Sequence, residues 1–388
     1  MSHGDFLALR RIPSLDGLRA VSILLVITAH PAYEHFWPSF HGHTGVSIFF
    51  VLSGFLITTL ALREAERSGR VSLSAFYVRR AFRIYPLYYL VLGVYCFIVF
   101  VIGIDAERSR SFAEELPWYL LGTPEHAVYF TGTGAHPPFT FAWSLGVEEK
   151  FYLVWPLVGF VLLGRRSVRC RSLLLATVVV ACTVASAFDA PVLRAIAPYG
   201  LLATGCLSAL LLHEARCYRY LVRLGEARYL VPLTALLLLL QFGTREVTPG
   251  GSLYVVYGLV VAPVMIGVVV RRGSGVGWLN ARPVVFLGTI SFGLYLTNAL
   301  ALDVAERVIG VGHGLPGSLL STLVGFVLAV VASACLHRWF EEPLHSVGRR
   351  IARAVEGRAG RAAGSSPPAK GLLAHRRGPR SGPEPSGG

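Results

Sequence analysis

The chain has 388 residues, of which 54% are hydrophobic and 15% charged, and its formal net charge is +14. This composition excludes an ordinary soluble domain, because long apolar runs recur up to about residue 340. The basic residues lie in short segments between apolar runs, so the positive charge indicates membrane topology and not nucleic-acid binding. The six cysteines have no metal-ligand spacing, and we predict no metal site.

We predict an all-α, multi-pass protein of the cell membrane with about ten transmembrane helices, because a bilayer core about 30 Å thick needs roughly 20 apolar residues per helix. The predicted spans are 14–32, 43–62, 84–104, 141–163, 172–189, 193–213, 229–243, 252–270, 284–303 and 317–337. With both termini in the cytoplasm, 28 of the 36 Lys and Arg residues fall in inside segments and 5 in outside loops. The asymmetry predicts that both termini are cytoplasmic.

The chain divides into two predicted parts. Residues 1–345 form the membrane-embedded domain. Residues 346–388 are rich in Gly, Pro, Ser, Ala and Arg and show no apolar period, so we expect a basic, disordered cytoplasmic tail. Its charge would also attract it to anionic lipid.

The first predicted span, "SLDGLRAVSILLVITAH", carries three residues that are costly inside a membrane. Arg19 and His30 are 11 residues apart, so they fall on one helix face about 16 Å apart along the axis. Asp16 precedes Arg19 by three residues and can pair with it. The alternative is that Arg19 extends to the interface from the helix end and that His30 is an interfacial histidine.

Two stretches follow that suit ligand binding. In "GVSIFFVLSGFLIT", the small residues Ser53 and Gly54 allow a thin ligand, or simply a neighbouring helix, to approach. In "FYVRRAFRIYP", Arg79, Arg80 and Arg83 form a guanidinium cluster that suits phosphate. The alternative for the arginines is a topology signal alone.

The stretch "FAWSLGVEEKFYLVWP" places Glu148, Glu149 and Lys150 about two turns into a span. Adjacent carboxylates at that depth are difficult to explain as solvated surface, and one of them could pair with His30. The alternative is a helix that begins later and leaves these charges outside.

These stretches, in this order, resemble the acyltransferase 3 family of integral-membrane O-acyltransferases. The resemblance rests on the Arg19 to His30 spacing after "SLDGLRA", followed by "FFVLSGFLIT", "RRAFRIYP" and "WSLGVEEKFYLVWP", and it covers about residues 10–345. Members of this family acylate bacterial surface polysaccharides, peptidoglycan, lipochito-oligosaccharides and macrolide antibiotics. The resemblance implies a ten-helix fold and acyl-CoA as the usual donor.

The resemblance also implies site residues. It assigns function to Arg19 and His30, places Arg80 and Arg83 near CoA, and puts one glutamate of the pair in the active centre. The chain departs from the family twice: Lys150 stands where Gln is common, and "YLTN" at 295–298 stands where "YLWH" is common. The second departure leaves no histidine there for a late-helix role.

We therefore expect an O-acyltransferase that uses acetyl-CoA or another short-chain acyl-CoA as co-substrate and needs no other cofactor. The expected catalytic residues are His30 as general base and Glu148 or Glu149 as its orienting carboxylate. The expected substrate-binding and CoA-binding residues are Asp16, Arg19, Ser53, Gly54, Arg79, Arg80 and Arg83. Direct transfer is favoured over an acyl-enzyme, because no Ser or Cys has an evident base beside it.

The acceptor is expected to be a hydroxyl of a macrolide antibiotic or its sugar, because the chain is a short single module and 34 of its 36 basic residues are Arg. A cell-surface glycan is the alternative within the enzyme class. A transporter or exporter is the alternative from another class, although no internal repeat is visible. The expected partners are acyl-CoA, the acceptor and the lipid bilayer, with no nucleic acid; the sequence leaves the oligomeric state open.

Overall fold

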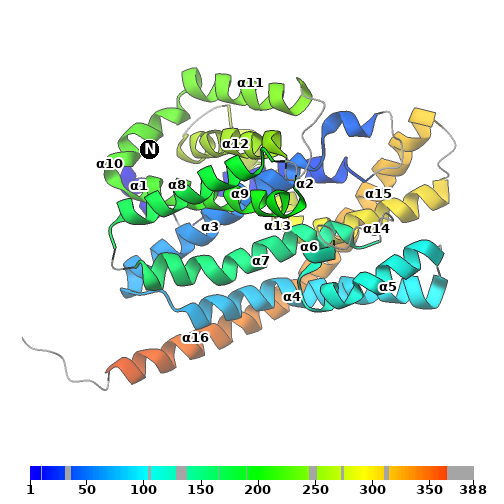
Figure 1. The fold of residues 1–388 in the computed structure, drawn as a ribbon, viewed down its shortest axis with the longest axis horizontal. Helices are drawn as coiled ribbons and strands as arrows, with labels where there is room; N and C mark the ends of the chain where they lie inside the picture. Colours follow the sequence, from blue (N-terminus) through cyan, green and yellow to red (C-terminus); the bar gives the residue numbers. More distant parts are fainter. Residues whose placement is uncertain are drawn as a thin grey trace, which may run out of the picture.

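The computed structural model describes residues 1–9, 11–30, 36–103, 106–127, 138–164, 166–188, 190–243, 251–271, 275–309 and 314–364. Within these ranges the regular elements are all helices, as the all-α prediction requires. Most of the long helices run roughly along the long axis of the molecule (Figure 1).

The α-helices are α1 (His3–Ala8), α2 (Pro13–Ile27), α3 (Thr44–Ser68), α4 (Leu73–Phe97), α5 (Ala106–Leu120), α6 (Pro124–His126), α7 (Trp143–Pro156), α8 (Val168–Ala185), α9 (Pro191–His213), α10 (Ala215–Leu221), α11 (Ala227–Gly243), α12 (Ser252–Val270), α13 (Arg282–Thr289), α14 (Ser291–Ile309), α15 (Gly314–Leu336) and α16 (Glu342–Gly364). The short 3-10 and π segments are η1 (Trp37–Phe40), η2 (Ile98–Gly103), η4 (Thr140–Ala142), η5 (Leu157–Leu162), η6 (Val222–Gly225), η7 (Gly277–Asn280) and η8 (His337–Glu341).

The chain is a multi-pass membrane protein. In its described part, six helices are long and apolar enough to cross a membrane, or up to eight if each of two bent helix pairs forms one span. The count of ten spans and the cytoplasmic placement of both termini stay predictions. One bent pair is α13 and α14, which meet at 77°, so the predicted span 284–303 is not one straight helix. Here α13 turns onto α2, and an added Cβ at Gly288 would collide with the Asp16 carbonyl.

Three helices form the core of the bundle. The apolar windows of α3, α9 and α12 are 72% buried, whereas that of α8 is only 17% buried. The backbones of α3 and α9 touch, because a Cβ added at Gly54 or Gly205 would collide with a carbonyl oxygen of the other helix. Close backbone approach through small residues is typical of helix packing in membranes. The less buried helices expose apolar side chains suited to lipid.

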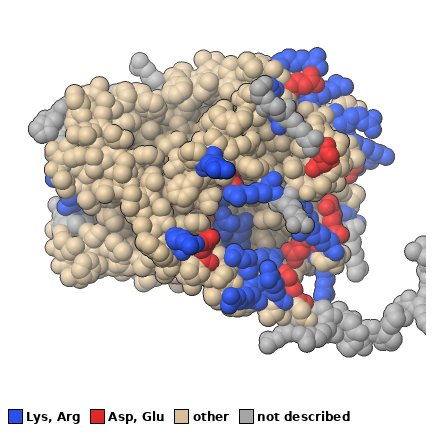
Figure 2. Space-filling view, turned by 180° about the vertical axis from the view of Figure 1, so that it is seen from behind, with Lys and Arg blue, Asp and Glu red and all other residues tan. Residues whose placement is uncertain are grey.

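Charge is distributed unevenly over the surface. Figure 2 shows Lys and Arg gathered mainly at one end of the molecule, while most of the face in view carries no charge. The exposed apolar side chains include Leu173 and Val180 of α8 and Leu323 and Val327 of α15. An apolar surface of this extent on a soluble monomer would be unusual, and it fits contact with lipid.

The predicted disorder from residue 346 is wrong as far as Gly364, because α16 continues as a helix to that residue. The prediction relied on the basic composition and overlooked the residues that pack on α4. Gly348 and Ala352, one turn apart, are both buried. An added Cβ at Gly348 would press on the Phe82 side chain. Residues 365–388 lie outside the described part, and the division of the chain into a domain and a tail stays a prediction.

Candidate active site

A cavity of about 1080 Å³, which we name the arginine cavity, is the largest of the four described here. It lies between the end of α3, the turn into α4, the start of α4, and α16. Its lining includes seven arginines: Arg63, Arg67, Arg70, Arg79, Arg80, Arg83 and Arg349. The three arginines predicted from "FYVRRAFRIYP" therefore do lie together, and four others join them.

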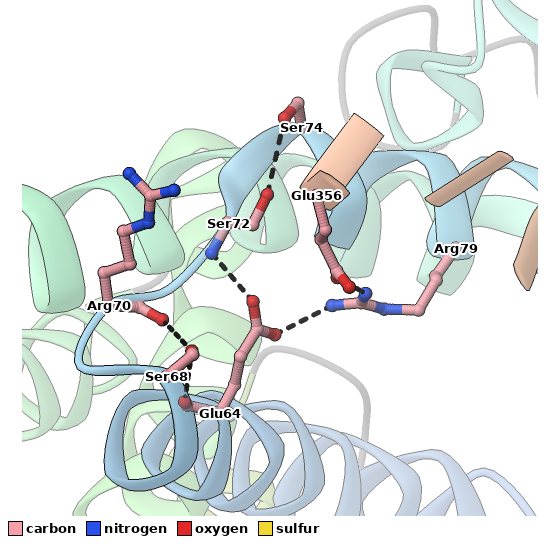
Figure 3. Close-up of polar contacts among 7 residues, drawn as sticks. All are labelled: Glu64, Ser68, Arg70, Ser72, Ser74, Arg79 and Glu356. Atoms are coloured by element: carbon pink, nitrogen blue, oxygen red, sulfur yellow. Dashed lines mark hydrogen bonds and ion pairs between the residues drawn. The ribbon is translucent and has the colours of Figure 1, made fainter. Parts of the chain in front are cut away.

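Arg79 differs from its neighbours because its guanidinium is already paired. It donates to Glu64 Oε2 at 2.8 Å and to Glu356 Oε1 at 2.6 Å (Figure 3). Glu64 also accepts a hydrogen bond from the Ser72 backbone N–H at 2.7 Å. Arg79 thus joins α3, α4 and α16 and is not a free cation for a donor, contrary to the prediction.

Arg63, Arg80 and Arg83 have no carboxylate within ion-pair distance among the described residues. Arg80 lies over the ring of Tyr152, with Cζ 4.5 Å from the ring centroid. Arg63 is 9% exposed, and its Nε and Nη2 have no hydrogen-bond partner. Arg80 is half-buried and Arg83 is exposed, so the cost of burying a cation falls mainly on Arg63. Together the three unpaired guanidinium groups favour an anionic ligand.

A second cavity of about 290 Å³, the bridging cavity, shares Arg63, Arg83 and His345 with the first. Arg19 lines it and donates from Nε to Ser291 Oγ at 3.2 Å. The predicted ion pair between Asp16 and Arg19 is absent. Asp16 instead accepts from Arg11 at 2.8 Å, because Arg11 reaches it from the turn before α2.

Glu148 lies beside Arg19 in a third cavity of about 60 Å³, the glutamate cavity. Its carboxylate accepts from Ser53 Oγ at 2.8 Å and from Tyr152 Oη at 2.7 Å. Ser144, Glu148 and Tyr152 are each four residues apart, so they lie on one face of α7. The predicted site residues Ser53 and Glu148 are therefore brought together with Arg19.

Glu149 points elsewhere. It accepts a hydrogen bond from Tyr85 of α4 and lines none of the cavities described here. Lys150, the departure from the family pattern, forms an ion pair with Glu125 of α6. Glu125 is 5% exposed, so the lysine neutralises a buried carboxylate that would otherwise be costly.

Gly54 was predicted to contact substrate, but the structure places it in the α3–α9 contact. A Cβ at this position would collide with the Leu202 carbonyl. Ser53, its neighbour in sequence, faces the glutamate cavity instead. Helix packing, the alternative interpretation, therefore accounts for Gly54.

His30 lies in a turn after α2, which ends at Ile27 and not near residue 32 as predicted. Its Nδ1 is 3.0 Å from the Val26 carbonyl oxygen, which can only accept, so Nδ1 carries the proton. In the neutral ring Nε2 is then the basic nitrogen, and it has no hydrogen-bond partner among the described residues. A backbone carbonyl, and neither Glu148 nor Glu149, orients the imidazole.

His30 lines a cavity of about 460 Å³, the histidine cavity, together with Tyr95, Trp143 and Asp303. Tyr295 and Val46 line both this cavity and the glutamate cavity. The bridging and glutamate cavities share Arg19 and Phe292. The four cavities therefore adjoin in series, from the arginines at the start of α4 to the imidazole beyond the end of α2.

Comparison with known proteins identifies the family. The family model for acyltransferase 3, described as an acyltransferase domain, matches residues 12–338, which is most of the chain. The chain belongs to this family. No solved structure matches it.

The curated relatives of this family member include a putative peptidoglycan O-acetyltransferase, YrhL, of Bacillus subtilis, which is 30% identical over 88% of the chain and 56% of the relative. The peptidoglycan O-acetyltransferase OatA of Listeria monocytogenes is 27% identical over 87% of the chain and 56% of the relative. OatA of Staphylococcus aureus is 35% identical over 40% of the chain and 26% of the relative. The chain thus spans about half the length of the YrhL and Listeria OatA relatives.

Sequence reasoning missed several residues of this acyltransferase site. Tyr295 and Ser291 lie one turn apart in "ISFGLYLTN", and Ser144 and Tyr152 flank Glu148 at helical spacing, so the period of four residues could have shown them. Arg349 belongs to a segment that resembled a tail, and no local pattern pointed to it. Asn298 donates to carbonyls of its own helix and lines none of these cavities.

The two glutamates should respond differently to the same substitution. Glu148→Gln removes the negative charge beside Arg19 and one acceptor site, so acyl transfer should fall about 10- to 100-fold. Glu149→Gln should change transfer far less, because its carboxylate meets Tyr85 away from the cavities. Initial rates of both variants at matched protein levels are the measurement. Equal losses in the two variants would contradict the assignment.

Proposed function

We propose that this acyltransferase moves an acyl group from acyl-CoA to a hydroxyl of a cell-surface glycan. The observation that carries the proposal is the series of adjoining cavities. One end offers unpaired guanidinium groups, and the other end offers a neutral imidazole. A donor with a polyanionic head and a long, thin, reactive arm matches this arrangement.

The arginine cavity suits the phosphate groups of CoA. Guanidinium groups bind phosphate through forked, charge-assisted hydrogen bonds, and Arg80 and Arg83 have no competing carboxylate among the described residues. The arm of the donor would then pass Arg19 and Glu148. The Glu148 carboxylate can accept from an amide N–H of the arm, while Arg19 can donate to an amide carbonyl.

The chemistry is assigned to His30. The acceptor hydroxyl loses its proton to Nε2 while its oxygen attacks the thioester carbonyl. The new C–O ester bond forms, the C–S bond breaks, and the CoA thiolate leaves and takes the proton back. The Val26 carbonyl keeps the proton on Nδ1 and so keeps Nε2 available as the base.

A glycan acceptor is favoured over the macrolide that we expected first. The relatives named above carry names of peptidoglycan O-acetyltransferases, and they give the macrolide branch no support. The histidine cavity adds aromatic side chains, Tyr95, Phe141 and Trp143, beside a carboxylate, Asp303. Aromatic faces with a few polar groups suit the binding of a small polar ligand such as a sugar ring.

The transporter alternative finds less support. The two bent helix pairs, α10–η6 with α11 and α13 with α14, both lie after residue 214. A transporter built from repeats would carry such breaks at corresponding positions in its two halves.

The proposal is tested by product analysis. Purified protein in lipid nanodiscs, given isotope-labelled acetyl-CoA and peptidoglycan-derived oligosaccharides, should yield acetyl esters detectable by mass spectrometry. His30→Gln should lower the rate about 10²- to 10⁴-fold, because an amide can hydrogen-bond but cannot accept the proton. A His30→Gln protein with wild-type turnover would remove the imidazole from the mechanism.

A second experiment distinguishes donor binding by Arg80 and Arg83 from a role of these arginines in membrane topology alone. Arg80→Ala or Arg83→Ala should raise the KM for acyl-CoA about tenfold or more, because each removes charge-assisted phosphate contacts. Arg83→Lys should restore only part of the affinity, because an ammonium cannot make the forked contact. Arg166→Ala is the matched control, since Arg166 is exposed and lines none of these cavities. An unchanged donor KM in the two cavity variants would leave these arginines as topology signals.

A further inference from the structure

α16 lies outside the part of the chain that the family model matches, which ends at residue 338. It nevertheless contributes His345, Arg349 and Glu356 to the lining of the arginine cavity. The same cavity is lined by Arg80 and Arg83 of α4, the helix on which α16 packs. A segment beyond the matched domain therefore forms part of the cavity wall.

The docking of α16 onto α4 fixes where these side chains lie. Gly348 packs directly on Phe82, and Ala352 is 1% exposed. One turn further on, Glu356 accepts from Arg79 at 2.6 Å (Figure 3). Contacts along about two turns hold the helix against α4, so α16 is part of the folded domain over this length.

The charges at this wall remain uncompensated. The carboxylates of Glu64 and Glu356 are both used by Arg79. Arg349 has no carboxylate within ion-pair distance among the residues described, and it is exposed. His345 lines both the arginine and the bridging cavity, and its Nε2 is buried with no hydrogen-bond partner. The Arg349 guanidinium can donate to an anion.

We propose that α16 completes the donor site, with Arg349 as a phosphate-binding residue supplied from outside the family-matched domain and His345 lining the cavity beside it. The ligand class is an organic polyphosphate, which the nucleotide end of acyl-CoA provides. The identity of that ligand rests on the proposed function, whereas the role of α16 is a separate claim. A chain that ended at residue 345 would keep Arg80 and Arg83 but lose this wall.

The test is binding of free CoA to the full chain in nanodiscs, measured by calorimetry without any transfer step. Arg349→Gln should raise the Kd about tenfold. Arg350→Gln makes the same charge change on the next residue, which lines none of these cavities, and should leave the Kd within about twofold. Equal effects of the two variants would show a general charge effect and overturn the proposal.

Two glycine variants test docking without changing any charge. Gly348→Ala should raise the Kd severalfold, because its Cβ presses on Phe82 and displaces α16 from the cavity. Gly357→Ala is the matched control on the same helix, since its Cβ would meet open space. Unchanged binding in Gly348→Ala, with α16 shown displaced by crosslinking, would contradict the proposal.

Truncation gives an independent result. A chain ending after Gly364 should bind CoA like the full chain, whereas one ending after Leu344 should bind at least about tenfold more weakly. Equal binding by both truncations would overturn the role of α16 and leave the proposed function standing. No CoA binding by the full chain would overturn the CoA donor itself, and this inference with it.

Discussion

Arginine without a carboxylate partner, lining the cavities of a mostly apolar helical bundle, is the constraint on which the rest of this structure depends. Arg63, Arg80 and Arg83 line cavities of a membrane protein without ion pairs among the described residues. For the buried Arg63 this arrangement is costly unless an anion completes it. Arg79 shows the contrast, because two carboxylates from two other helices satisfy it and make it a structural cross-link. The paired Arg79 therefore holds the helices together, whereas the unpaired arginines form the candidate binding site.

Two further polar residues of the cavities, Arg19 and His30, lie on α2 and in the turn that follows it. Arg19 is hydrogen-bonded to Ser291 of α14 and shares the glutamate cavity with Glu148, so a cation and an anion meet where a donor arm would pass. At the far end the helix stops at Ile27, and the turn that follows brings the His30 ring back to the Val26 carbonyl. The Val26 carbonyl therefore sets the tautomer of the His30 imidazole. Glu148 does not contact this ring and instead accepts hydrogen bonds from Ser53 and Tyr152. Arg19 lines the bridging and glutamate cavities and His30 the histidine cavity, so in the proposed function the two residues would stand at successive points of the donor's path.

The sequence predicts residue faces better than it predicts partners. The cost of charge within a span pointed to Arg19 and the Glu148–Glu149 pair, and small size pointed to Ser53; the structure brings Arg19, Ser53 and Glu148 together. Local patterns could not show that Arg79 meets Glu356, because that partner lies 277 positions away in a segment whose composition resembles a disordered tail. Gly54 illustrates the same point, because α9 reaches it through tertiary packing. Asp16 pairs with Arg11, five residues earlier, and still lines the bridging cavity, so its predicted binding role stays a prediction. The bend between α13 and α14 likewise follows from contact with α2 and not from hydropathy.

The central claim is that one protein connects a donor site at the arginine end to an acceptor site at the His30 end. The most direct measurement uses sealed proteoliposomes in which the side that exposes a Ser68→Cys label is known. Labelled acetyl-CoA is supplied on that side only, and a glycan acceptor is supplied either on the same side or on the opposite side. The account predicts ester formation when the acceptor is opposite the donor, and little when both share the Ser68 side. Equal ester formation in the two arrangements would contradict the connected route.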